Sequence, residues 1–130
     1  MKMNFPENLK YTKDHEWAKI DGTQITVGIT DHAQSALGDV VFVELPKVGR
    51  DLKAGETFGV VESIKAVSDL YSPVSGKVLA VNDAVVGEPS SVNRDPHTSA
   101  WLIKIETSDA SALSGLMDST AYSAFVSSIK

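Results

Sequence analysis

Lys65 has the sequence setting best suited to covalent chemistry. Two strand-like runs flank it, and Gly55 and Gly76 lie about equally far away on either side. This near-symmetry predicts a β-hairpin with Lys65 at or beside the reversal. An amine on such a turn can be reached by another protein from many directions. It is therefore a suitable attachment point for an acyl group that a separate, activated donor delivers.

The residues around this lysine distinguish it from an ordinary one. A lysine in a surface turn is usually a solvated side chain that aids solubility. Here small, acidic and apolar neighbours occupy fixed places around the amine, and a Ser-Pro-Val-Ser-Gly segment closes the return strand. The neighbours are Glu62, Ser63, Ile64 and Ala66. The combination favours a modification site.

Other kinds of chemistry find less support in the sequence. The three histidines, His15, His32 and His97, lie in separate segments without zinc-ligand spacing. A hydrolytic triad using Asp14 or Asp31 is not expected, because no serine sits in a nucleophile-elbow setting. The chain has no cysteine, which excludes a thiolate nucleophile, a disulfide framework and a cysteine metal site.

The elements that must position Lys65 are mostly short strands separated by glycine and proline. An Asp21-Gly22 turn joins the first two. The β-branched run that follows Gly38 ends at Pro46, as a strand should. The predicted strands are 16–20, 24–29, 40–45, 58–64, 69–74, 77–81 and 101–105.

Helical patterns are shorter and lie mainly at the end of the chain. Thr30 or Asp31 can cap a helix that Gly38 ends, residues 87–98 form a loop with one helical turn, and helix returns from Asp109. There Leu113, Leu116 and Met117 share one face, before Asp118 or Ser119 caps a last helix.

We expect one domain over 1–130, with a core at about 9–108 and a helical tail at 109–130. Its class is mostly β, a β-sandwich or flattened barrel.

Charge and hydropathy limit the partners. The net charge of -5 and the pI near 5.1 argue against a nucleic-acid partner, because phosphate binding needs clustered basic residues. The apolar runs are far too short to span a bilayer, so no membrane association is expected. The first residues contain no hydrophobic signal core and no Arg-rich stretch. A cytoplasmic protein of bacterial type is therefore expected.

Three segments resemble the H proteins of the glycine cleavage system. The last of them is similar to the lipoyl-attachment motif, and with Val92-Asn93, Asp95-Pro96 and 101–105 the resemblance runs from about Leu9 to Phe125. The chain departs from the family pattern at 97–100, where the family usually has an aromatic residue and a Gly-containing acidic turn. The three segments are 11–17 (YTKDHEW), 27–46 (from VGITDHAQ to FVELP) and 59–69 (GVVESIKAVSD).

The resemblance implies a non-catalytic, monomeric carrier with the lipoyl-domain, or barrel-sandwich hybrid, fold. Lys65 would be joined by an amide to lipoate as N6-lipoyllysine. A glycine decarboxylase would load the aminomethyl group of glycine, an aminomethyltransferase would unload it, and dihydrolipoamide dehydrogenase would reoxidise the dithiol. Lipoylating enzymes would act on the chain beforehand. These roles belong to glycine catabolism and one-carbon metabolism.

The resemblance also implies a cleft that protects the loaded arm from water. By motif position, Glu16 would be the anionic partner of the aminomethyl ammonium. The other residues implied near it are Asp14, Ile29, Ala33, Leu37 and Asp69. For the apolar members, plain core packing is the competing interpretation.

Several alternatives stay open. Biotin carriers usually place methionine on both sides of the lysine, where this chain has Ile64 and Ala66. Lipoyl domains of 2-oxoacid dehydrogenases usually have Asp before the lysine and lack the segment at 30–33. An H-like protein can also serve as a lipoate relay. An unmodified interaction module, or a small hydrolase that uses the histidines, is the alternative from another class.

Overall fold

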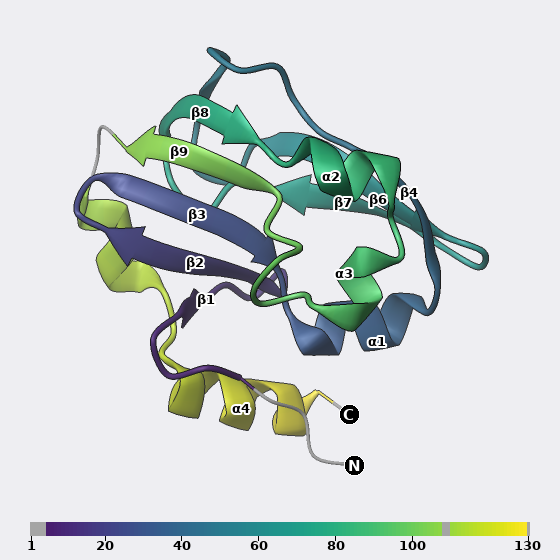
Figure 1. The fold of residues 1–130 in the computed structure, drawn as a ribbon. Helices are drawn as coiled ribbons and strands as arrows, with labels where there is room; N and C mark the ends of the chain where they lie inside the picture. Colours follow the sequence, from purple (N-terminus) through teal and green to yellow (C-terminus); the bar gives the residue numbers. More distant parts are fainter. Residues whose placement is uncertain (1–4, 108–109, 130) are drawn as a thin grey trace.

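The computed structural model describes residues 5–107 and 110–129, which form two antiparallel sheets packed face to face (Figure 1). This confirms the predicted mostly-β sandwich, and the described strands form two sheets without closing into a barrel. The larger sheet has the order β1 (Lys10–Tyr11), β2 (Glu16–Asp21), β3 (Gln24–Ile29), β9 (Ile103–Thr107), β8 (Gly76–Val81) and β5 (Asp51–Leu52). The smaller one has the order β4 (Val40–Glu44), β6 (Thr57–Ser63) and β7 (Val67–Tyr71).

The main core lies between the two sheets. Alternate residues of β3, namely Ile25, Val27 and Ile29, are buried, because successive side chains of a strand point to opposite faces. From the smaller sheet, Val61 and Leu70 join the same apolar cluster. Burying each such side chain stabilises the fold by about 1.5–3 kcal/mol.

A second, smaller core joins the C-terminal helix α4 (Ser119–Ser128) to β1 (Figure 1). The rings of Tyr11 and Tyr122 stack with their centroids 4.7 Å apart. Asp118, one of the two predicted caps, accepts a hydrogen bond of 2.8 Å from the Ala121 amide. The position of this helix therefore depends on contacts with the first strand of the chain.

The segment before α4 differs from the predicted helix. It is a 3-10 helix, η1 (Ala110–Gly115), after which the Met117 backbone pairs with Tyr11 through hydrogen bonds of 2.8 Å. Serine and glycine are weaker helix formers than alanine, and Gly115 ends the short turn. Asp109, where the helix was predicted to begin, lies outside the described residues.

Several element boundaries also differ from the predictions. The β2–β3 turn is Gly22-Thr23, one residue later than predicted, because Asp21 pairs with Gln24. Strand β7 ends at Tyr71, before Pro73, which has no amide to donate to a ladder. Strand β9 begins at Ile103 rather than Trp101. Two short helices, α2 (Asp83–Gly87) and α3 (Ser91–Arg94), precede β9. The sequence predicted only one helical turn in this part of the chain.

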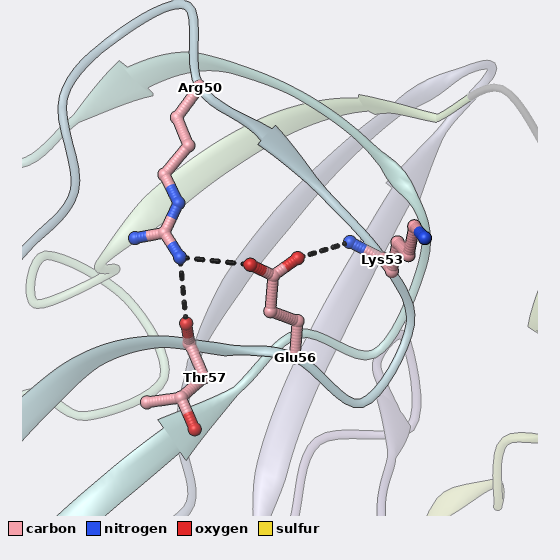
Figure 2. A network of polar contacts seen from close by, with 4 residues as sticks. All are labelled: Arg50, Lys53, Glu56 and Thr57. Atoms are coloured by element: carbon pink, nitrogen blue, oxygen red, sulfur yellow. Dashed lines mark hydrogen bonds and ion pairs between the residues drawn. The ribbon is translucent and has the colours of Figure 1, made fainter.

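A polar network holds the start of β6 (Figure 2). The Arg50 guanidinium donates hydrogen bonds to the Glu56 carboxylate at 3.0 Å and to the Thr57 carbonyl at 3.2 Å. The Lys53 amide donates to the other Glu56 oxygen at 2.9 Å. The Lys53 amide and then Arg50 lower the pKa of Glu56. This surface network orients the strand that leads to the predicted hairpin turn.

Candidate functional site

Lys65 lies in the loop 64–66 at the tip of the β6–β7 hairpin, since β6 ends at Ser63 and β7 begins at Val67. The hairpin extends beyond the rest of the ribbon in Figure 1. The Ser63 amide donates a hydrogen bond of 2.8 Å to the Ala66 carbonyl. None of the three loop residues has a positive φ, so the turn is not one of the primed types that tight hairpins favour. The Ser63 hydroxyl stabilises this turn by accepting hydrogen bonds from the Ala66 amide at 3.1 Å and the Lys65 amide at 3.3 Å.

The Lys65 side chain is exposed at this tip, and the described residues form no ion pair with it. Its stem passes Gly38, where an added Cβ would lie 3.5 Å from Lys65 Cε. Gly38 has a φ of +83° and ends helix α1 (Asp31–Leu37), and its amide donates to the Gln34 carbonyl at 3.0 Å. The amine is therefore placed beside the C-terminal end of α1.

A cleft of about 340 Å³ opens next to Lys65, between α1, β7 and the segment that leads into β2. It contains all six residues that the resemblance implied, Asp14, Glu16, Ile29, Ala33, Leu37 and Asp69. Ala66, next to Lys65, also lines it. The cleft residues that sequence analysis did not assign to a cleft are His15, His32, Ala36, Val61, Val67, Ser68 and Leu70.

Glu16 is the buried acid of this cleft, with 2 % of its surface exposed. Thr12 Oγ1 donates a hydrogen bond to one carboxylate oxygen at 2.9 Å, and the Tyr71 amide donates to the other at 3.1 Å. No lysine or arginine of the described residues pairs with it. Burial raises the pKa of Glu16 to about 8, and the two hydrogen bonds offset that effect only in part. Burial therefore favours the protonated form of this carboxyl.

Tyr122 of α4 connects two walls of the cleft. Its buried hydroxyl shares hydrogen bonds of 2.8 Å with His15 Nδ1 and with Thr30 Oγ1. Thr30 is the residue that caps α1, accepting a bond of 3.1 Å from the Ala33 amide. His15 has a φ of +68°, and its ring centroid lies 4.6 Å from that of His32. Burial, and then the neighbouring histidine, lower the pKa of His15.

Asn93 holds the other end of α1. Its amide nitrogen donates to the Gly38 carbonyl at 2.9 Å and to Gln34 Oε1 at 2.9 Å. Its amide oxygen accepts from the Val40 amide at 2.8 Å. Asn93 therefore joins the end of α1 to the start of β4, and so places the wall beside Lys65.

The segment 97–100 that departs from the family pattern packs against the start of α1. His97 Nε2 accepts a hydrogen bond of 3.1 Å from the Asp31 amide, one of the helix N-terminal amides that have no intrahelical partner. Burial lowers the pKa of His97. Ala100 is buried in the main core. The unusual residues thus provide a helix cap and a core contact.

Sequence reasoning missed Thr12, Tyr122 and Asn93 as parts of this site. Thr12 could have been found from the sequence, because a hydroxyl four residues before an acid can hydrogen-bond to that acid across a turn. Tyr122 carried none, because its two partners are 92 and 107 residues away in the sequence. Asn93 was noted only as part of the resemblance.

Comparisons with known proteins agree with this geometry. The family model described as "Glycine cleavage H-protein" matches residues 9–129. The chain is 55% identical over 123 residues to the glycine cleavage system H protein of Myxococcus xanthus, covering 95% of each chain. It is 58% identical over 124 residues to that of Acidobacterium capsulatum, again covering 95% of each. A crystal structure of a glycine cleavage system H protein from Mycobacterium marinum matches with a TM-score of 0.88 and 40% identity, over 95% of this chain and 99% of that one. The chain therefore belongs to the glycine cleavage H-protein family.

Proposed function

We propose that Lys65 carries the lipoyl group of this glycine cleavage H protein. Family membership makes the chain a carrier rather than an enzyme, and a lipoyl group is a property of the family. The observation that carries the assignment to Lys65 is its position: an exposed amine, without an ion pair among the described residues, in a short hairpin loop beside a cleft.

The residues around Lys65 fit this group. An amide at Nζ needs an amine that another enzyme can reach, and the hairpin tip offers one. When bound, the lipoyl group supplies a dithiolane that takes up and releases cargo and electrons. The chain supplies the position of its anchor, since Ser63 and Ala66 hold the turn and Gly38 leaves room for the lysine stem.

The partners follow from the family. A glycine cleavage H protein works with the P, T and L proteins, which are glycine decarboxylase, aminomethyltransferase and dihydrolipoamide dehydrogenase. A tethered group reaches an effective concentration of roughly millimolar at a docked active site, which supports a covalent carrier over a diffusing cofactor. No helix of the described residues is long and apolar enough to cross a membrane. A location in the bacterial cytoplasm stays a prediction.

The cleft supports a protective role toward an amine cargo. Ile29, Ala33 and Leu37 provide apolar walls that exclude water. Glu16 lies among them as an acid without a cationic partner in the described residues. An ammonium that enters the cleft stabilises the carboxylate and lowers its pKa, so Glu16 releases its proton as the cargo arrives. We expect Glu16→Gln to shorten the lifetime of the loaded arm, and an unchanged lifetime would reject this role.

The test of the carrier proposal is the Lys65→Arg variant. Wild-type protein from a lipoylation-competent host should contain a fraction heavier by one lipoyl group, with the added mass at Lys65. The variant should lack this mass and fail to support glycine–bicarbonate exchange, at an unchanged unfolding midpoint. Lys77→Arg, a change at another exposed lysine, should keep both properties. Added mass or exchange activity in the Lys65→Arg protein would refute the proposal.

A further inference from the structure

A bulge in β4 places two consecutive apolar residues on the surface. Val40 pairs with Ser63 and Phe42 pairs with Glu62, so Val41 is the extra residue between them. In a regular strand one of two neighbours would face the core. Here Val41 is 56% exposed and Phe42 is 45% exposed. Bulges redirect side chains in this way, often beside functional sites.

These two residues continue into the hairpin that carries Lys65. Phe42 pairs with Glu62, which pairs in turn with Val67, so the three form a row on the outer face of the smaller sheet. Val67 is 67% exposed, and Ile64, next to Lys65, is 81% exposed. Together Val41, Phe42, Ile64 and Val67 form what we call the tip patch. Exposed apolar groups gathered in this way indicate a protein-binding surface.

Apart from Lys65 itself, the charged residues on this face of the β4–β6–β7 sheet are acidic. The next row of the same face is Glu44, Val60 and Asp69, and Glu62 lies within the first row. These two rows contain three acids and no lysine or arginine. An apolar patch with an acidic border fits a partner that has an apolar contact surface with basic residues around it.

We propose that the tip patch is the docking surface for the enzyme that acylates Lys65. This inference rests on the proposed function. Before acylation the reacting atom is Lys65 Nζ, only one side chain away from the hairpin. The acylating active site must therefore cover the tip and contact the patch. Enzymes that act at the far end of a lipoyl arm can reach it at a distance from this surface.

The chemistry of acylation also favours a sealed contact. Deprotonated Nζ attacks the carbonyl carbon of an activated donor such as an acyl adenylate. The new C–N bond forms, the C–O bond to the adenylate breaks, and AMP leaves with the electron pair while the amine loses a proton. Water would hydrolyse the same donor, so the enzyme gains from excluding it. Four exposed apolar side chains on the hairpin and on the neighbouring strand β4 suit such a seal.

The experiment measures acylation of the apo-protein by a lipoate–protein ligase with lipoate and ATP, followed by intact mass. For Phe42→Ser and Val41→Ser, two patch residues outside the cleft, we expect kcat/KM to fall by at least about tenfold, the loss typical of a truncated interface anchor. Val48→Ser removes an equally exposed apolar side chain, 60% exposed, outside the patch. It should remain within about twofold of wild type. Unfolding midpoints and the reduction of pre-lipoylated protein by dihydrolipoamide dehydrogenase serve as controls.

A competition assay separates docking from chemistry. Lys65→Arg protein cannot be acylated but retains the patch, so it should inhibit acylation of the wild type. The double variant Phe42→Ser, Lys65→Arg should inhibit much less. The docking inference would be overturned if the patch variants were acylated at the wild-type rate, or if they were impaired only in the reduction of the lipoyl arm. Either result would leave the carrier proposal standing. An unacylated Lys65 in the wild type would instead overturn the carrier proposal.

Discussion

The raised pKa of Glu16 predicts an unusual dependence of stability on pH. Burial raises this pKa from 4.5 to about 8 in the folded chain. Between these two values the folded chain binds more protons at Glu16 than the unfolded chain does. The contribution of Glu16 to the free energy of unfolding is therefore fully present below pH 4.5 and is lost as pH rises through about 8.

The size of the effect follows from the same two values. The difference between them corresponds to a loss on the order of 5 kcal/mol over the whole window. Glu16→Gln removes the titration but keeps a side chain of similar shape. Glutamine has one acceptor oxygen, so it loses one of the two accepted hydrogen bonds, at a cost of about 1 kcal/mol. By these values the two proteins should be about equally stable near pH 5, and the variant should become the more stable one as pH rises toward 8.

The assay is urea unfolding of both proteins from pH 5 to pH 9. Because other titrating groups are common to both, the difference in unfolding free energy isolates Glu16. Thr12→Val serves as a second variant, since it removes the hydroxyl that donates to Glu16 and should move the pH transition upward. If the wild-type and Glu16→Gln profiles stay parallel over this range, Glu16 does not hold its proton in the fold and the reasoning fails.

Two further predictions concern the surroundings of the cleft. Tyr122→Phe leaves the ring but removes both hydrogen bonds of its hydroxyl, so the free energy of unfolding should fall by about 1–3 kcal/mol in a urea titration. A loss below the error of the titration would mean that this hydroxyl does not join α4 to the cleft. Gly28→Ala places a Cβ only 2.6 Å from the buried Trp17 ring, so the indole must move and thermal denaturation should show a clear loss of stability. A wild-type midpoint would show that the ring shifts freely.

The predicted elements that proved correct are those with local causes. Helix α1 begins after Thr30 and ends at Gly38 because a hydroxyl cap and a residue with positive φ act within a few positions of each other. The hairpin around Lys65 follows from two strand-like runs separated by a short turn. The family relationship likewise depended on three contiguous stretches of sequence.

The features that the sequence did not predict depend on distant contacts. The bulge that turns Val41 and Phe42 outward arises from the pairing of β4 with β6, which no local pattern of an apolar run indicates. The 3-10 segment before α4 ends where Met117 pairs with Tyr11, more than a hundred residues earlier in the chain. Long-range pairing overrides local propensity in both places.

The sequence by itself determined the family, the sandwich class and the presentation of Lys65 on a turn, because strand, turn and cap preferences act between near neighbours. Only the tertiary structure decided the chemistry around it. The protonation of Glu16 depends on burial under β7, whose Tyr71 amide lies 55 residues away. The cleft walls depend on Tyr122 and Asn93, which reach α1 from later parts of the chain. Burial and long-range hydrogen bonds are properties of the folded chain, and a pKa follows them rather than residue type.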